Sequence, residues 1–210
     1  MLSFQTEVGI LATMFRKKSY TCVALAAFFL STASAVAEQT WFVRTWQSDA
    51  GLPDNTVLGI EQTPDGFLWV ATKTGLVRFD GVQFREFSTQ APGMAVDVIY
   101  AMCADHKGRI WVAKERGSVV CVEQGRITEI LADLPDGSER RPRMLVVDRE
   151  DGVWVSRING ELLRIRDGKV RAYTTEDGLP PGGASELAVD PSGHVWFLRN
   201  GMLGFIREEK

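Results

Sequence analysis

One motif occurs four times along this chain, and its spacing constrains the fold more than any other feature. Each copy has a tryptophan in a short apolar run, then a glycine, then a second apolar run, as in GFLWVATKTGLVRFDG at 66–81. The tryptophans are spaced by 42, 43 and 42 residues and are Trp69, Trp111, Trp154 and Trp196. The glycines that follow them keep similar intervals and are Gly75, Gly117, Gly160 and Gly201. A constant period of this length is typical of a repeated structural unit.

Each copy predicts four short strands joined by tight turns. In the first copy we expect strands over 57–62, 68–72, 76–79 and 83–88. Pro64-Asp65-Gly66 and Asp80-Gly81 are turn signals, because glycine adopts the positive φ that short hairpins need. No stretch after residue 37 has sustained helical periodicity. A four-stranded antiparallel unit repeated in tandem is typical of a β-propeller blade, so we predict an all-β protein with about four blades' worth of strands.

The predicted blades span about 55–88, 97–131, 143–174 and 185–210. A single blade cannot bury both of its faces, so neighbouring blades must stack. The four tryptophans occupy one place on the second strand of each blade. We therefore assign them a structural role, filling the gap between neighbouring blades.

The two ends of the repeat array are irregular. The fourth copy stops at about its third strand, and its fourth strand is missing. At the other end, WFVRTWQSDAGLP at 41–53 aligns with KVRAYTTEDGLP at 169–180, so we expect 41–48 to form an orphan outer strand. Propellers commonly close their ring with such a strand, which removes a raw sheet edge. Two interpretations remain open: the N-terminal part of a larger propeller, or a complete four-bladed ring or a half-ring that pairs with a second copy.

The N-terminal segment has the layout of a secretory signal peptide. Three basic residues, Arg16, Lys17 and Lys18, precede an apolar run that ends near Leu30, and the small residues Ala35 and Ala37 follow. The apolar run is shorter than the roughly 20 residues that span a bilayer. We expect 1–37 to be a signal peptide cleaved after residue 37, with Met14 a better start than Met1. The mature chain is then exported, and we expect it in the periplasm.

Charge and cysteine content bound the function further. The formal net charge is −3, and the basic residues form no stripe, which argues against a nucleic-acid partner. An exported pair of cysteines, Cys103 and Cys121, could indicate a disulfide. They fall on the predicted first and third strands of one blade, about 9–10 Å apart. Because a disulfide needs Cα atoms within about 7 Å, we predict two free buried thiols.

The first copy also carries a family resemblance. GLPDNTVLGIEQTPDGFLWVATKTGLVRFDGVQF at 51–84 closely resembles the two-component regulator propeller repeat, and weaker resemblance extends over about 41–210. It implies the periplasmic sensor region of a membrane-bound receptor whose output is a histidine kinase, a diguanylate cyclase or a DNA-binding domain. Many members of this family sense oligosaccharides. The 210 residues contain no phospho-acceptor histidine region or nucleotide-binding motif, so we expect the output domain and the membrane attachment to lie outside them.

Propeller geometry predicts where a ligand would bind. The turns between second and third strands, and the connections from one blade to the next, gather at one end of the sheets. Candidate ligand-binding residues in these loops are Asp54, Asn55, Lys73, Arg116, Arg140, Arg141, Arg143, Asn159 and Arg199. Arg140, Arg141 and Arg143 form the densest basic group and could bind an acidic sugar or another carboxylate through bidentate hydrogen bonds.

No catalytic or metal-binding constellation is predicted, and no cofactor. The two histidines, His106 and His194, fall in turns of different blades without converging partners. We therefore expect a periplasmic ligand-sensing propeller without enzymatic activity, with a small molecule or oligosaccharide as its ligand. Its other expected partners are further propeller repeats or a second copy. The alternatives are a secreted propeller lyase or hydrolase that acts on polysaccharide, and a stand-alone binding module.

Overall fold

The computed structural model describes residues 41–87, 98–132 and 140–206. The chain divides into two units, Met1–Arg44 and Thr45–Lys210, and the second unit contains all described strands. Of the first unit, 41–44 are described and carry neither helix nor strand. The predicted signal peptide at 1–37 lies outside the described residues. No helix among the described residues is long and apolar enough to cross a membrane.

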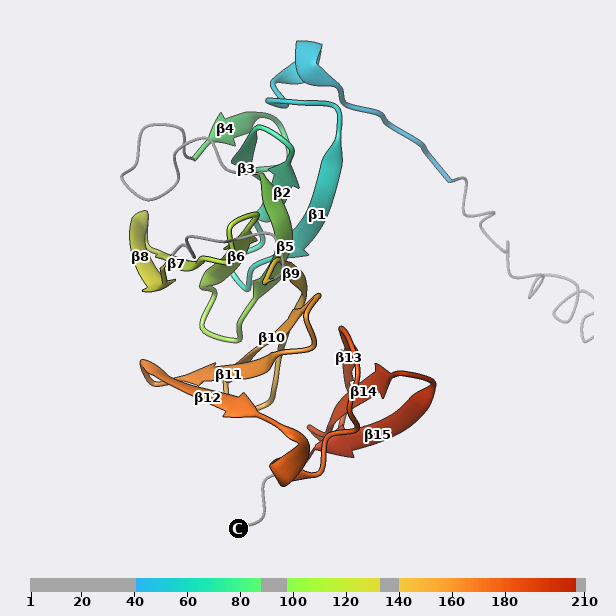
Figure 1. Ribbon diagram of the computed structural model, residues 1–210. Helices are drawn as coiled ribbons and strands as arrows, with labels where there is room; N and C mark the ends of the chain where they lie inside the picture. Colours follow the sequence, from blue (N-terminus) through green and yellow to red (C-terminus); the bar gives the residue numbers. More distant parts are fainter. Residues whose placement is uncertain (1–40, 88–97, 133–139, 207–210) are drawn as a thin grey trace, which may run out of the picture. The chain divides into compact units, whose positions relative to one another are not determined.

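The second unit consists of four antiparallel sheets that follow one another along the chain (Figure 1). The first three have four strands each, and the fourth has three among the described residues. The strands are β1 (Val57–Gln62), β2 (Leu68–Thr72), β3 (Gly75–Phe79), β4 (Phe84–Glu86), β5 (Ile99–Ala104), β6 (Ile110–Lys114), β7 (Val119–Glu123), β8 (Arg126–Leu131), β9 (Pro142–Val147), β10 (Val153–Arg157), β11 (Leu162–Arg166), β12 (Lys169–Tyr173), β13 (Glu186–Val189), β14 (Val195–Arg199) and β15 (Met202–Ile206).

Within each sheet the spatial order of the strands equals their order in the sequence. The first strands of consecutive sheets contact one another, β1 with β5, β5 with β9, and β9 with β13. Sheets of this kind, stacked through their faces with their first strands adjacent, are propeller blades. The predicted all-β propeller architecture is therefore confirmed, and the strands expected over 57–62 and 68–72 agree with β1 and β2 to the residue.

The four tryptophans occupy matching positions, as predicted. Each lies on the second strand of its sheet, β2, β6, β10 or β14. Trp69 packs with residues of the second sheet, Trp111 with the third, and Trp154 with the fourth, and all three are buried. Trp196, in the last sheet, is half-buried. The first three indole rings therefore fill the gaps between neighbouring sheets, where burial of apolar area supplies most of the stabilisation.

The segment before β1 differs from the prediction in one respect. Residues 41–47 form no strand, and a short 3-10 helix, η1 (Ser48–Ala50), follows, so the predicted outer strand over 41–48 does not form in the described structure. A strand needs a paired edge, whereas here Trp46 packs its ring against Phe79 of β3, with 5.2 Å between ring centroids. Completion of another sheet by 41–48 stays a prediction.

The predicted correspondence of the two exit loops holds. A second 3-10 helix, η2 (Thr175–Asp177), follows β12 as η1 precedes β1. Each helix ends at a glycine with positive φ, Gly51 at 102° and Gly178 at 87°. The leucine that follows is buried in both loops, Leu52 and Leu179. The shared Gly-Leu-Pro motif therefore specifies one loop shape, in which glycine permits the turn and leucine anchors it.

The cysteine prediction is also confirmed. Cys103 on β5 and Cys121 on β7 are free and buried, and Trp111 on β6 pairs with both of them in the sheet register. Burial raises the pKa of the Cys103 thiol well above its ordinary value and that of Cys121 to about 11. Both are packing residues rather than nucleophiles.

Candidate functional site

The two ends of the sheets present different chemistry. At one end, which we call the loop end, lie the turns between second and third strands and the connections between sheets. At the other, the turn end, lie the turns between first and second strands and between third and fourth strands. In the first sheet the loop end carries Lys73, and the turn end carries Asp65 and Asp80. Because strand direction alternates in every sheet, equivalent turns of all four sheets fall at the same end.

All nine candidate ligand residues lie at the loop end, but several of their side chains already have hydrogen-bond partners within the protein. The side chains of Asp54, Asn55 and Asn159 each accept a backbone N–H from a nearby loop residue, at 2.6, 2.8 and 3.1 Å. These three residues shape the loops through local turns, which is the ordinary use of Asp and Asn at such positions. Lys73 and Arg116 are exposed, and no ion pair or side-chain hydrogen bond engages either within the described part of the chain.

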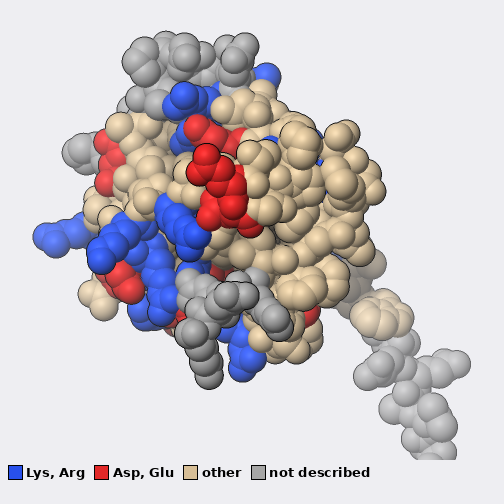
Figure 2. All heavy atoms as spheres, turned by 60° about the horizontal axis from the view of Figure 1, so that its bottom comes forward, with Lys and Arg blue, Asp and Glu red and all other residues tan. Residues whose placement is uncertain are grey.

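The basic group near the start of β9 is paired with its surroundings. The Nε of Arg143 donates to Glu186 Oε1 at 2.7 Å, and Nη1 of Arg141 donates to the hydroxyl of Tyr100 at 3.1 Å. Both partners belong to neighbouring sheets, so Arg141 and Arg143 link the third sheet to its neighbours at the loop end. On the face seen in Figure 2, Lys and Arg side chains lie beside Asp and Glu side chains.

A buried arginine that the sequence did not single out also lies at the loop end. Arg157, at the end of β10, donates from Nη2 to the carbonyl of Gly117 at 3.0 Å and from Nη1 to Glu161 Oε2 at 2.8 Å. Arg140 approaches the other oxygen of the same carboxylate at 3.9 Å. Arg157 therefore connects the third sheet to the loop-end turn of the second.

Arg199 repeats this bridge one sheet further on. It is buried at the end of β14, and its Nη1 and Nη2 donate to the carbonyls of Gly160 at 2.7 Å and Gly182 at 2.6 Å. Burial lowers the pKa of the guanidinium, since few groups compensate its desolvation. The structure thus gives Arg199 a role in joining sheets.

At the turn end, three sheets share a hydrogen bond between an indole N–H and a carboxylate. The pairs are Trp111 with Asp105 at 2.9 Å, Trp154 with Asp148 at 2.8 Å, and Trp196 with Asp190 at 2.8 Å. In each case the other carboxylate oxygen accepts backbone N–H groups of the intervening turn. These aspartates were missing from the sequence-based prediction. The constant spacing of six residues from aspartate to tryptophan could have identified them.

The first sheet departs from this pattern. The residue six positions before Trp69 is Thr63, whose hydroxyl donates to Asp65 Oδ1 at 2.5 Å instead. Within the described residues the indole N–H of Trp69 has no hydrogen-bond acceptor. The blade that matches the family pattern best therefore lacks the carboxylate that its three neighbours carry.

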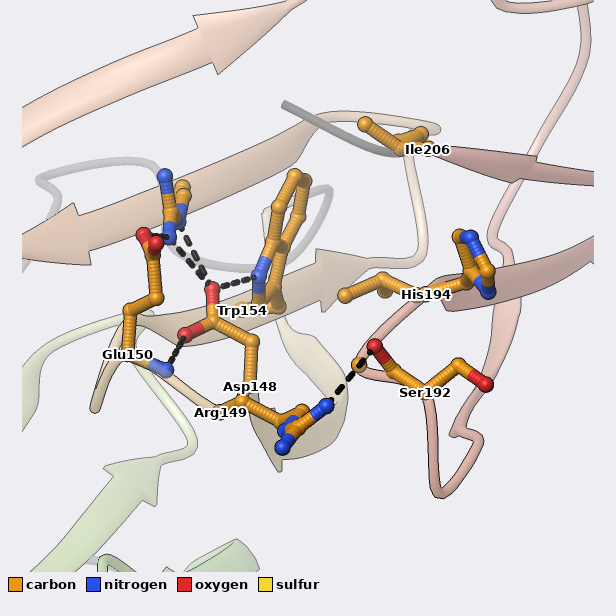
Figure 3. Close-up of a pocket in the computed structure, with 10 residues that line it drawn as sticks. Asp148, Arg149, Glu150, Trp154, Ser192, His194 and Ile206 are labelled. Carbon is orange, nitrogen blue, oxygen red and sulfur yellow. Dashed lines mark hydrogen bonds and ion pairs between the residues drawn. The ribbon is translucent and has the colours of Figure 1, made fainter. Parts of the chain in front are cut away.

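A cavity of about 530 Å³ opens at the turn end between the third and fourth sheets (Figure 3). Asp148 lies at its wall, where its Oδ2 accepts from Trp154 and from Arg164, with Arg164 Nε at 2.8 Å and Nη2 at 2.7 Å. From the same turn, Arg149 reaches across and donates to the carbonyl of Ser192 at 3.2 Å. The cavity thus has ion-paired walls contributed by two sheets.

The charges of this cavity cancel. Two basic residues, Arg149 and Arg164, and two acidic residues, Asp148 and Glu150, line it. The Glu150 carboxylate approaches Arg164 at 3.2 Å and also contacts Arg166. Since each carboxylate already has a cationic partner, this cavity offers little net attraction to a charged ligand.

The histidines lie at the turn end, as expected. His106 Nδ1 is 2.9 Å from Asp151 Oδ1 of the next sheet, and His194 Nδ1 is 2.9 Å from Asp190 Oδ2. The indole N–H of Trp196, together with His194, holds the pKa of Asp190 well below its usual range, so this carboxylate is ionised at neutral pH. In the described ranges no three His, Cys, Asp or Glu side chains form a group able to hold a metal ion.

Comparison with known proteins agrees with this geometry. The fold is that of a β-propeller built from blades of about 42 residues. Two segments of the chain, 51–74 and 93–113, match the family model of the two component regulator propeller. The resemblance of the sequence to this repeat family is thereby confirmed for these two segments. No curated protein matches the chain by sequence.

Several solved structures share the fold at low identity. The extracellular domain of hybrid two component system BT4673 from B. thetaiotaomicron is 16% identical with a TM-score of 0.67, over 82% of this chain and 24% of that one. The extracellular domain of hybrid two component system BT3049 from the same organism is 20% identical with a TM-score of 0.58, over 74% and 22%. Virginiamycin B lyase from Staphylococcus aureus is 19% identical with a TM-score of 0.57, over 74% and 54%. The chain thus spans about a quarter to a half of the length of these relatives.

Proposed function

We propose that this chain is the ligand-sensing propeller region of a membrane-bound two-component receptor and acts outside the cytoplasm, in the periplasm. The match of 51–74 and 93–113 to the two component regulator propeller carries this proposal. The fold that the chain shares with extracellular domains of hybrid two component systems supports it. In this role the propeller binds a small molecule or an oligosaccharide and has no catalytic step, and the signalling output resides in another domain.

The loop end is the proposed ligand-facing surface for this role. Lys73 and Arg116 are its exposed cations without an ion pair in the described structure, and Arg140 is only weakly paired, at 3.9 Å from Glu161. Exposed cations at the loop end attract acidic sugars and donate hydrogen bonds to sugar oxygens, and neither interaction requires a catalytic step.

Export is the first test. The full chain, expressed with its N-terminal segment in a Gram-negative host, should be recovered from the periplasm with Glu38 as its first residue in N-terminal sequencing. Retention of the intact chain in the cytoplasm would contradict the proposal.

Ligand binding is the second test. A glycan array probed with the exported chain should show a defined set of bound oligosaccharides. The double variant Lys73→Gln/Arg116→Gln should lower the signal, whereas Lys169→Gln, which removes an exposed cation from β12, should not. Turnover of a bound polysaccharide by the purified chain would instead favour the lyase or hydrolase alternative.

A further inference from the structure

A second cavity lies at the turn end between the first and second sheets, at the place equivalent to the cavity of Figure 3. Its volume is about 630 Å³, which is within the range of small-molecule sites. Trp69 and Arg78 line it, as Trp154 and Arg164 line the cavity between the third and fourth sheets. The register confirms the equivalence, because Trp69 pairs with Arg78 across β2 and β3 as Trp154 pairs with Arg164 across β10 and β11.

The two cavities differ in one decisive residue. In the third sheet the carboxylate of Asp148 lies between the indole N–H of Trp154 and the guanidinium of Arg164 and neutralises the arginine. In the first sheet Thr63 stands at the position of Asp148 and supplies no charge. The same pair of donors is therefore present in both cavities, but only one cavity has its acceptor.

Aromatic rings position the guanidinium of Arg78 so that it can bind an anion. Its guanidinium carbon lies 4.1 Å from the ring centroid of Phe67 and 5.9 Å from that of Trp69, so aromatic rings fix the planar group from the side. Within the described residues no hydrogen bond or ion pair engages it. Stacking leaves the N–H edge of a guanidinium available, and that edge matches the two oxygens of a carboxylate.

The charge of the lining favours a singly charged ligand. Three basic residues, Arg78, Arg85 and Lys107, and two acidic ones, Asp65 and Glu86, line this cavity. Arg85 and Lys107 have acidic partners outside the lining, Asp80 at 3.9 Å and Asp151 at 3.5 Å, so Arg78 is the lining cation without an ion pair among the described residues, and a monoanion matches its single charge. In the equivalent cavity of Figure 3, the corresponding arginine, Arg164, is already paired with Asp148.

We propose that the cavity between the first and second sheets binds a small organic monocarboxylate, whose carboxylate takes the place that Asp148 occupies in the third sheet. Arg78 binds the carboxylate with its guanidinium, and Trp69 donates its indole N–H. Phe87, which also lines the cavity, provides an apolar wall for the body of the ligand. The site lies at the opposite end of the sheets from the proposed loop-end surface, and its occupation does not require a receptor role.

The test follows the indole N–H of Trp69 by NMR in the purified chain, titrated with galacturonate and with benzoate. Galactose and benzyl alcohol, which lack the carboxylate, serve as matched neutral probes. We expect the Trp69 signal to shift with at least one carboxylate and with neither neutral probe. A response to galacturonate alone identifies a uronic acid site, and one to benzoate alone an aromatic acid site. The absence of a shift with both carboxylates overturns the proposal.

Variants separate the site from general effects of charge. Arg78→Gln should weaken carboxylate binding about tenfold or more, because the charged hydrogen bonds are lost. Thr63→Asp should abolish binding by supplying an internal carboxylate, and it restores the arrangement that the third sheet already tolerates. Lys169→Gln removes an equal charge elsewhere and should leave the affinity unchanged. Unchanged affinity in both site variants would refute the role of Arg78, whether or not the chain is exported.

Discussion

Replacing Asp148 with asparagine tests how far the buried ion network of the third sheet stabilises the propeller. The carboxylate is buried, and its Oδ1 accepts the backbone N–H groups of Glu150 at 2.9 Å and Gly152 at 2.8 Å. Its Oδ2 accepts from Trp154 and Arg164. An asparagine can keep its oxygen toward the backbone donors, but its NH₂ group then faces the indole N–H and the guanidinium.

The expected cost follows from what is left unpaired. The side chain of Arg164 is only 8% exposed, so it would remain as a buried cation whose closest anion is gone. Removing one member of a buried ion pair costs about 3–5 kcal/mol. Glu150, at 3.2 Å from Arg164, is half-exposed and can offset only part of this loss. We therefore expect Asp148→Asn to lower the free energy of unfolding by about 3–5 kcal/mol, a large share of the roughly 5–15 kcal/mol of a typical domain.

Urea unfolding followed by tryptophan fluorescence measures this change. Asp167→Asn is the matched control, because Asp167 is exposed and 3.6 Å from Arg166, and such surface pairs contribute about 0–1 kcal/mol. The double variant Asp148→Asn/Arg164→Met should be more stable than Asp148→Asn alone, since it removes the unpaired cation. A loss below about 1 kcal/mol for Asp148→Asn, or no recovery in the double variant, would refute this account.

Three further predictions concern glycine, acid stability and the thiols. Gly160→Ala should be strongly destabilising, because φ is +92° and an added Cβ would overlap a backbone carbonyl of the neighbouring loop. Gly168→Ala is the control: with φ +72° and open space around the added Cβ, it should lower the free energy of unfolding, measured by thermal unfolding, by only about 1–2 kcal/mol. The folded-state pKa of Asp190 is depressed, so the stability that its ionised carboxylate gives the fold is complete above the ordinary carboxylate pKa and is lost as the pH falls. The difference in Tm between the native chain and Asp190→Asn should therefore be constant from about pH 8 to 5 and narrow below about pH 4. Cys103 and Cys121 should resist alkylation at about pH 8 in the native chain and react fully in denaturant, because both are buried and have raised pKa values; rapid native-state labelling would contradict their assigned positions.

Much of the fold could be predicted because it depends on residues that are close together in the sequence. The alternation of apolar residues, the Asp-Gly turns and the tryptophan period specify hairpins whose partners are adjacent in sequence. For the same reason β1 and β2 were predicted to the residue. The two cysteines were also placed correctly, on β5 and β7, with β6 and its Trp111 between them. The candidate ligand residues all fall at one end, since strand alternation alone decides which turns share an end.

The contacts that join different sheets could not be predicted in this way. Arg157 and the carbonyl of Gly117 are 40 residues apart, and Arg199 and that of Gly160 are 39 apart. Whether an arginine at the loop end faces a ligand or a neighbouring carbonyl depends on how closely two sheets approach, and no local pattern encodes that distance. The outer strand expected over 41–48 stays a prediction for a related reason, because its pairing needs a sheet edge that the local sequence does not supply.

The sequence by itself determined the repeat, the antiparallel blades and the matching place of the four tryptophans on the second strands, because each of these depends on residues a few positions apart. Only the tertiary structure decided which charges meet. It placed Asp148 against Arg164 in one sheet, and it left Arg78 of another sheet without an ion pair in the described chain. That difference matters physically because a buried or half-buried charge is neutralised only by a partner within a few ångströms, and stacking of the sheets sets that distance.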